Sequence, residues 1–496
     1  MLKTSLRFLG ISVICLILAD IEVTTLDPWI ELRRMIQGAL TPNVYVLWDF
    51  RAAFLNTLVF ALCGITFGIL LGAPLSLLFH RPTVRIGCAL VRAVHEIFWA
   101  FLFLPIVGLN PICGVLAIAI PYAGVFAKVF AEIIQEADAR PARALPNRTD
   151  PVTRFAYGVL PIVIRSVKSY SSYRLECALR SSAVLGFIGL PTLGFHLETA
   201  FREGLYSEAA AILYAFYFLI FSLKWWVRPR LVPVWIVGAF VLLAKDVSVR
   251  WENIARFGHE VLPWPMRRQG ILDGTQSVDW STRETSQWFF DLIGNQAFRG
   301  VWDTVVLTQV VLGVTGIFAV LAFPLVCRHF WSRKVRGVGS IFLIVLRTTP
   351  EYILAYIFIQ LWGPSMLPAI VAIALHNGAI LAHLTGARAN QIELREDSPK
   401  RNLDRYGYEI LPRAYGQLLA FLFYRWEIIA RESAILGILG IYTLGFFIDS
   451  AISDDKLDQA ILLIAVSAVI NVGIDMVSQA VRKRLRISVG EVTTLT

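Results

Sequence analysis

The stretch from Tyr173 to Phe195, "YRLECALRSSAVLGFIGLPTLGF", is written again from Tyr424 to Phe446 as "YRWEIIARESAILGILGIYTLGF". The two copies lie 251 positions apart and agree at 13 of 23 positions without a gap. Both place charged residues inside otherwise apolar chain. Self-similarity over this distance indicates that the chain contains two copies of one structural unit.

Other segments match at nearly the same distance. The segment "VRAVHEIFWAFLFLPIVG" (91–108) matches "LRTTPEYILAYIFIQLWG" (346–363) at an offset of 255. The segment "RFAYGVLP" (154–161) matches "RYGYEILP" (405–412) at an offset of 251. The small drift in offset indicates loop insertions within a duplication of about 250 residues, which is far too long a repeat for a solenoid.

The composition is that of a membrane protein. Hydrophobic residues make up 56% of the 496 residues and charged residues 17%, and the mean hydropathy is +0.63. We predict an all-α polytopic membrane protein with about twelve transmembrane helices, six in a first repeat (1–228) and six in a second (229–496). The first span has no small-residue cleavage site after Ile21 and Glu22, so we expect an uncleaved anchor and not a signal peptide. The expected spans lie near 5–21, 54–79, 90–107, 111–131, 159–189, 205–224, 231–247, 302–327, 341–361, 367–386, 410–440 and 457–481.

The two repeats are expected to be parallel. Five spans separate the two copies of the opening stretch, so both copies cross the membrane in the same direction, and their pseudo-two-fold axis lies along the membrane normal. Basic residues gather at the ends of spans, which places those ends and the C-terminus in the cytoplasm and the loops 22–52 and 248–300 outside. The basic residues in question are Arg81, Arg85, Arg92, Arg328, Arg333, Lys334, Arg336, Arg482, Lys483, Arg484 and Arg486.

No signature of an enzyme or of a metal site is visible in the sequence. It contains no GxxxxGK[ST] phosphate loop, no HExxH, no GxSxG and no Cys/His metal cluster. The six cysteines are scattered without a CxxC pair, so we expect them to be small core residues. We therefore expect no catalytic residue, no metal and no cofactor in this chain. The net charge of +10 follows the span ends and does not indicate a nucleic-acid partner.

A polar, basic stretch that ends in Leu-Pro follows the fourth span of each repeat. These stretches are "EIIQEADARPARALPNRTDPVTRFAYGVLP" (132–161) and "RANQIELREDSPKRNLDRYGYEILP" (388–412). Here the chain resembles the permease subunits of binding-protein-dependent ABC importers, whose cytoplasmic coupling segment docks into a separate ATPase. The pattern RxxxE at the start of span three and the pattern YRxExxxRSxxxLGxxGxxxLGF resemble the phosphonate permease family. The resemblance covers nearly the whole chain twice, as if two copies were fused.

This resemblance implies a type I ABC importer fold, with coupling loops at about 132–160 and 388–411. It also implies a cytoplasmic ABC ATPase dimer that uses ATP, an extracytoplasmic solute-binding protein, and a place in the inner membrane of a bacterium. Coupling candidates are Arg154, Gly158, Pro161, Arg405 and Pro412.

Both coupling loops depart from the family pattern. The loop glycine of the family falls on Arg148 and Pro399, and the acidic residue that opens the coupling helix falls on Arg143 and Leu394. We expect a matching ATPase that has diverged together with these loops; the alternative is that the usual ATPase does not fit.

Charged residues and glycines in the repeated stretch are candidates for the translocation pathway or its gate. A buried ionisable group costs about 2.5–3.5 kcal/mol at the bilayer centre on insertion scales, so a chain that keeps several of them uses them, if only to fix structure. Acid and base are spaced i,i+4 in both copies, and the glycines permit close approach or a helix break. The alternative is plain close packing of helices. The candidates are Glu176, Arg180, Gly186, Gly189, Glu427, Arg431, Gly437 and Gly440.

A second set of charges lies at the start of span three of each repeat. We expect Arg92, Glu96, Arg347 and Glu351 to form an intramembrane brace and not to bind solute. His376 and Asn377 stand where the first repeat has a proline and a tyrosine, and we expect packing roles for both.

The leading functional hypothesis is the permease of an ABC importer for phosphonate or a related small phosphorus oxyanion. Alternatives are an ABC permease for an amino acid or an inorganic oxyanion, a secondary transporter, and a membrane scaffold. The coupling loops argue against a secondary transporter, because a self-powered carrier has no use for them.

Overall fold

The computed structural model describes residues 2–138, 140–146, 148–228, 230–243, 251–269, 276–278 and 282–485. The end of the span expected at 231–247, parts of the loop 248–300, and Arg486 lie outside this description.

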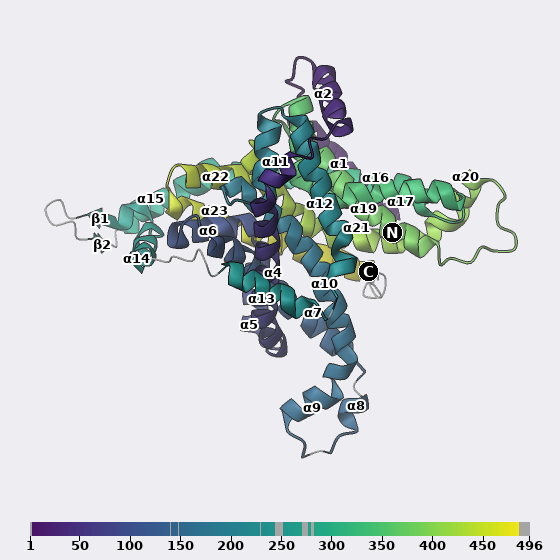
Figure 1. Cartoon of the computed structure of the whole chain (residues 1–496), viewed down its shortest axis with the longest axis horizontal. Coiled ribbons are helices and arrows are strands. Elements are labelled where there is room, and N and C mark those ends of the chain that lie inside the picture. Colours follow the sequence, from purple (N-terminus) through teal and green to yellow (C-terminus); the bar gives the residue numbers. More distant parts are fainter. Residues whose placement is uncertain are drawn as a thin grey trace. The chain divides into compact units, whose positions relative to one another are not determined.

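The described chain is almost entirely helical, which confirms the all-α expectation (Figure 1). A short antiparallel hairpin joins β1 (Arg267–Gln269) to β2 (Gln276–Val278). Among the described residues, 6 helices are long and apolar enough to cross a membrane, and the number rises to 10 when each bent helix pair counts as one span. The two other expected spans correspond to α1 (Leu2–Leu18) and α13 (Val232–Leu243), which are shorter.

The chain divides into two compact units. We call Gln37–Phe257 the first-repeat unit, and Met1–Ile36 together with Gly258–Gly490 the second-repeat unit. Helices α2 (Pro28–Leu40) and α14 (Trp251–Glu260) contain the two boundaries. The other helices of the first-repeat unit are α3 (Val46–Asp49), α4 (Arg51–Leu77), α5 (Pro82–Ala93), α6 (Glu96–Val107), α7 (Pro111–Glu136), α8 (Arg140–Arg143), α9 (Pro151–Gly158), α10 (Leu160–Val184), the 3-10 turn η1 (Leu185–Ile188), α11 (Leu193–Arg202) and α12 (Tyr206–Trp226). Those of the second-repeat unit are η3 (Trp264–Met266), α15 (Thr282–Leu292), η4 (Ile293–Ala297), α16 (Phe298–Ala322), η5 (Phe323–Val326), α17 (Arg333–Thr348), α18 (Glu351–Trp362), α19 (Met366–Ala389), α20 (Asn402–Arg405), η6 (Tyr406–Ile410), α21 (Leu411–Ser433), η7 (Ala434–Leu439), α22 (Leu444–Ser453) and α23 (Leu457–Arg484).

The first helix of the chain packs in the second-repeat unit. Helix α1 lies along α16, where Ser12 Oγ donates to the Gln309 carbonyl at 2.9 Å and the Gln309 amide donates back to Ser12 Oγ at 3.2 Å. Gly313 makes room for this contact, because a Cβ there would lie 2.6 Å from Ser12 Oγ. The segment that follows α1 continues on this unit, since Met366 N donates to the Asp20 carbonyl at 3.0 Å.

Helix α13 shows the converse arrangement. It follows the repeat boundary expected at 228, yet it packs on α4 of the first-repeat unit, where Phe240 meets Phe67 edge to face at 5.2 Å and Ala239 enters the core. The duplication in the sequence and the compact units of the structure therefore differ by one helix per repeat.

The third span of each repeat is broken, which corrects the expectation of single spans at 90–107 and 341–361. Helices α5 and α6 meet at 91°, and α17 and α18 also meet at 91°. Each break puts the arginine of the RxxxE pattern in the last turn of one helix and the glutamate at the first position of the next. Both charges complement the helix dipoles at those ends, which explains the spacing of the motif.

Candidate functional site

The repeated stretch folds into a tight helical return. In the first-repeat unit α10 ends in η1, Gly189 adopts a left-handed φ of 86°, and α11 departs at 54° to the preceding helix. A side chain at Gly186 is excluded, because its Cβ would lie 2.6 Å from the carbonyl carbon of Gly194. Glycine is thus required at 189 by backbone conformation and at 186 by close approach.

The second repeat forms the same return. Gly440 has φ 83°, the helices bend by 45°, and a Cβ on Gly437 would lie 2.8 Å from Gly445 Cα. A threonine hydroxyl caps the departing helix in both repeats. Thr57 Oγ1 accepts from Leu193 N at 3.0 Å, and Thr304 Oγ1 accepts from Leu444 N at 2.9 Å.

The predicted pairs Glu176–Arg180 and Glu427–Arg431 lie within the last three turns of α10 and α21, before these returns. All four side chains are half-buried within the chain. Arg180 Nη2 lies 3.5 Å from Cys177 Sγ, on its own helix. The assignment of these residues to a translocation pathway stays a prediction.

A polar cluster in the first-repeat unit joins α6, α7 and α10. The Ser181 hydroxyl donates to Glu96 Oε1 at 3.4 Å and lies 3.4 Å from the Tyr122 hydroxyl. His95 Nδ1 accepts from Ile97 N at 3.2 Å, so this ring carries its proton on Nε2, which lies 3.4 Å from Glu96 Oε2. The histidine therefore offers a proton to the carboxylate.

Arg174 lies beside this cluster on a platform of tyrosines. Its guanidinium carbon lies 5.6 Å from the ring centroid of Tyr122, 5.3 Å from Tyr170 and 5.9 Å from Tyr173. Its Nε donates to the Tyr170 hydroxyl at 2.8 Å. The aromatic faces stabilise the cation without neutralising it.

The corresponding positions of the second-repeat unit hold different chemistry. Asn377 replaces Tyr122, and its amide donates to Glu432 Oε2 at 2.7 Å while its carbonyl accepts from Arg425 Nε at 2.6 Å. Glu432 replaces Ser181. His376 Nε2 lies 3.9 Å from Glu351 Oε2, and Arg425, His376 and Asn377 are all buried.

These clusters contain residues that sequence reasoning missed. Arg174 and Arg425 belong to the repeated "YR" dipeptide, and this repetition was the available signal. His376 and Asn377 are buried, in keeping with the expected packing roles, but Asn377 also connects Glu432 to the buried Arg425, and His376 lies beside Glu351. Of the expected brace residues, Glu96 and Glu351 lie in the two clusters, whereas Arg92 and Arg347 end the preceding helices.

The coupling candidates of the first repeat lie on a short helical segment at the end of α10, where α8 and α9 fold together (Figure 1). Asp150 caps α9 by accepting from Thr153 N at 2.9 Å, and the hydrogen bonds from Thr153 lower the pKa of this carboxyl. Arg154 Nη2 donates to the Pro146 carbonyl at 3.4 Å. Gly158 ends α9, and Pro161 lies in the first turn of α10, where a proline is tolerated.

The second coupling loop is held by several side-chain hydrogen bonds. The Arg405 guanidinium donates to the His329 carbonyl at 2.9 Å and to the Pro399 carbonyl at 3.1 Å. Glu409 accepts from Arg395 N at 2.7 Å and from the Ser398 hydroxyl. Pro412 takes the position in α21 that Pro161 has in α10. The second coupling loop is therefore ordered by hydrogen bonds within the loop and by one to the His329 carbonyl.

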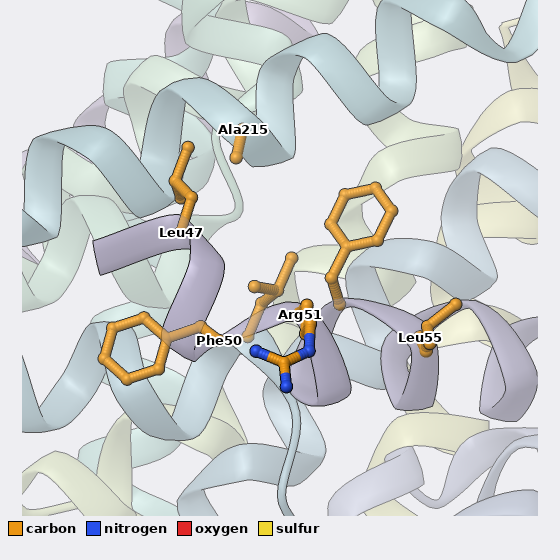
Figure 2. Close-up of a pocket in the computed structure, with 7 residues that line it drawn as sticks. Leu47, Phe50, Arg51, Leu55 and Ala215 are labelled. Carbon is orange, nitrogen blue, oxygen red and sulfur yellow. The ribbon is translucent and has the colours of Figure 1, made fainter. Parts of the chain in front are cut away.

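A pocket of about 390 Å³ lies at the start of α4 in the first-repeat unit (Figure 2). Six apolar residues and Arg51 line it. The guanidinium of Arg51 is already placed over Trp48 at 5.0 Å from the ring centroid, and it donates to the Trp48 carbonyl. With this lining the pocket suits an apolar group better than a small hydrophilic anion.

Comparison with known proteins shows similarity to permeases for phosphorus compounds. The chain is 26% identical over 474 residues to the phosphate-import permease protein PhnE of Mycolicibacterium smegmatis, covering 87% of this chain and 84% of that protein. It is 33% identical over 142 residues to the phosphite transport system permease protein PtxC of Stutzerimonas stutzeri, covering 28% of this chain and 51% of that protein. It is 30% identical over 99 residues to the putative cryptic phosphonate transport system permease protein PhnE2 of Escherichia coli, covering 20% of this chain and 81% of that protein.

No family model and no solved structure matches the chain. The alignment with the mycobacterial permease is nevertheless longer than one repeat of about 250 residues, so it runs through both repeats. The helical architecture, the duplicated return and this similarity lead to one conclusion: the chain belongs to the phosphonate permease family of ABC importer permease subunits, with two copies of the permease unit fused in one polypeptide.

Proposed function

We propose that this chain is the membrane permease of an ABC importer that moves phosphonate, phosphate, phosphite or a closely related phosphorus oxyanion into a bacterial cell. The observation that carries the proposal is the similarity to a phosphate-import permease along 87% of the chain. A cytoplasmic ATPase dimer supplies the energy, and an external binding protein delivers the solute. The permease itself performs no chemistry on the solute.

The coupling segments support docking to a partner in both repeats. Val152 and Tyr157 on α9 are 77% and 74% exposed, although they belong to apolar residue types. At the same offset of 251, Leu403 and Tyr408 are 81% and 82% exposed. An aliphatic and an aromatic side chain, repeated at the same spacing, form a matched pair of small apolar contacts for the two members of an ATPase dimer.

The translocation pathway is proposed to pass the two helical returns. The charged pairs Glu176–Arg180 and Glu427–Arg431 lie within the last three helical turns before them, and half-burial within the chain allows them to face a path between helices. An arginine there attracts a passing oxyanion, and the neighbouring glutamate limits how tightly the anion is held.

The docking surface can be tested without disturbing the fold, because its residues are exposed. In membranes that contain the ATPase subunit from the same genome, we expect Tyr157→Ser combined with Tyr408→Ser to lower co-purification of the ATPase by about tenfold or more. The matched control is Tyr45→Ser, which removes a tyrosine that is 90% exposed in the loop expected outside. Equal loss of the ATPase with both variants, or no loss with either, would contradict docking at these segments.

ATP hydrolysis gives a second test of the same proposal. The isolated chain is expected to hydrolyse no ATP, because it lacks a phosphate loop, and the complex is expected to gain hydrolysis when binding protein loaded with methylphosphonate or phosphate is added. Hydrolysis by the isolated chain would contradict the assignment as a permease subunit.

A further inference from the structure

We infer that the second-repeat unit contains a binding site for a divalent transition metal, with Zn²⁺ as the best match, formed by Glu351, His376 and Glu432. One ligand atom from each residue lies within 4.8 Å of the others. The residues come from α18, α19 and α21, so a bound ion would hold three helices of this unit together. The inference is independent of the transported solute, and it departs from the sequence-based expectation that the chain holds no metal.

The orientation of His376 is the first argument. Its Nδ1 lies 2.9 Å from the Thr349 carbonyl, and because a carbonyl can only accept, Nδ1 carries a proton. In the neutral ring Nε2 then bears the lone pair, and it faces the Glu351 carboxylate at 3.9 Å. A histidine that donates one ring N–H to a backbone carbonyl and presents the other nitrogen to a site has the arrangement of most metal-bound histidines.

The first repeat provides the contrast. His95 accepts a backbone N–H on Nδ1, so its Nε2 is the protonated nitrogen and faces the equivalent carboxylate, Glu96, at 3.4 Å. That histidine and carboxylate are complementary by themselves. In the second repeat Nε2 of the neutral His376 and the Glu351 carboxylate are both electron-pair donors, so a metal cation can be bound between them.

The spacing favours a metal ion over a proton as that cation. A direct hydrogen bond between imidazolium and carboxylate has a length of about 2.7–2.9 Å, so 3.9 Å is too long. Two atoms bound to one Zn²⁺ at about 2.0–2.2 Å are separated by about 3.4 Å in a tetrahedron and by about 4.2 Å at most. The His376–Glu351 distance of 3.9 Å is about 0.5 Å longer than the tetrahedral separation, and all three ligand atoms lie within 4.8 Å of one another, so binding requires a rotation of the carboxylates toward the ion.

The third ligand is oriented as well. The Asn377 amide donates to Glu432 Oε2 at 2.7 Å, and Arg425 Nε in turn fixes the Asn377 carbonyl at 2.6 Å. An outer layer of hydrogen bonds that fixes each ligand is typical of protein metal sites. One imidazole and two carboxylates suit Zn²⁺, Mn²⁺, Fe²⁺ or Co²⁺ better than Mg²⁺ or Ca²⁺, which prefer oxygen ligands throughout.

The test uses the full chain, purified in detergent with its affinity tag removed, because histidine tags bind Zn²⁺. After dialysis against a weak chelator, mass spectrometry of the metal content should find one equivalent of Zn²⁺. X-ray absorption should show nitrogen and oxygen neighbours at about 2.0–2.2 Å. Competition with a chromophoric chelator then gives the affinity.

Single substitutions test whether these residues bind the metal ion. Glu432→Ser, which installs the residue of the first repeat, and Glu432→Gln, which keeps the shape, should each weaken Zn²⁺ binding by more than about 100-fold. Asn377→Ala should weaken it by about 10- to 100-fold, since it removes only the orienting amide. Ser181→Ala changes the equivalent position of the first repeat and should leave the affinity unchanged. The inference is overturned if the wild-type chain retains no more Zn²⁺ than Glu432→Ser.

Discussion

The two repeats agree at the helical return and differ at the polar cluster that lies beside it. Both returns use a left-handed glycine, a glycine in close backbone contact, and a threonine cap from the second span. The clusters keep only the glutamate of α6 or α18 and the arginine of α10 or α21. Backbone geometry leaves no substitute for glycine, whereas a polar network can be rebuilt when several of its members change together. Fusion of two copies in one chain allows such independent change.

The difference between the clusters is a difference in how charge is balanced. In the first repeat Arg174 rests on tyrosine rings, and a serine and a histidine both donate toward Glu96. In the second repeat Asn377 connects Glu432 to Arg425, while Glu351 lies beside His376. The first-repeat unit thus keeps a cation on aromatic faces, and the second-repeat unit keeps a network that contains both acidic and basic groups.

The largest effect is expected where the repeats agree. Gly437→Ala places a methyl group against backbone atoms of Gly445 and Phe446 that cannot move aside. We expect the free energy of unfolding to fall by more than about 3 kcal/mol, and the yield of folded protein to fall with it, as for severe overpacking. Gly186→Ala should behave alike in the first repeat, measured by thermal unfolding in detergent.

Gly473→Ala is the matched control, since Gly473 lies within α23 and a Cβ there meets nothing within 4 Å. It should be neutral or stabilising by up to about 1 kcal/mol. Wild-type stability in Gly437→Ala would mean that the close approach is not obligatory and that the repeated glycines serve another purpose.

The sequence predicted the return well and the clusters poorly, for a physical reason. The glycines and the i,i+4 charges recur at an offset of 251, so the duplication itself reveals them, whereas the capping threonines, 247 positions apart, were not predicted. The pairing of Asn377 with Glu432 joins residues 55 positions apart on different helices, and no period in the sequence indicates it. The 91° break at α5–α6 was also missed, because no glycine or proline marks it; its signals are the charges of the RxxxE pattern and the histidine that caps α6. The exchange of α1 and α13 depends on tertiary packing alone.

An intermediate effect is expected where the repeats differ. Arg425→Ala removes a buried guanidinium that donates to the Asn377 carbonyl, and the loss of a hydrogen bond from a charged group costs about 1.5–3 kcal/mol. Arg174→Ala loses cation–π contacts and one hydrogen bond, about 1–2 kcal/mol in sum. Thermal unfolding of the two variants side by side measures the difference. Equal losses would show that the tyrosine platform and the carboxylate network bind their arginines equally strongly.

The smallest effect concerns the coupling segments, which differ in how their helices begin. Asp150 caps α9, whereas α20 begins after Arg401 without a side-chain cap among the described residues. The hydrogen bonds from Thr153 lower the pKa of Asp150 below its ordinary value, so the folded segment prefers the carboxylate. Because the pKa is depressed, the ionised Asp150 stabilises α9 fully at pH values above the ordinary pKa of about 3.9. This contribution disappears as the pH falls through the lower pKa of the folded state.

Hydrogen exchange at the Thr153 amide, corrected for the intrinsic rate, should therefore accelerate as the pH is lowered from 5 to about 3, while amides of α20 show no such step. Asp150→Asn keeps a hydrogen-bond acceptor at the cap but cannot titrate in this range. The exchange protection of the Thr153 amide in this variant should therefore not change with pH. A step of the same size in Asp150→Asn would assign the pH dependence to another group and remove this difference between the two coupling segments.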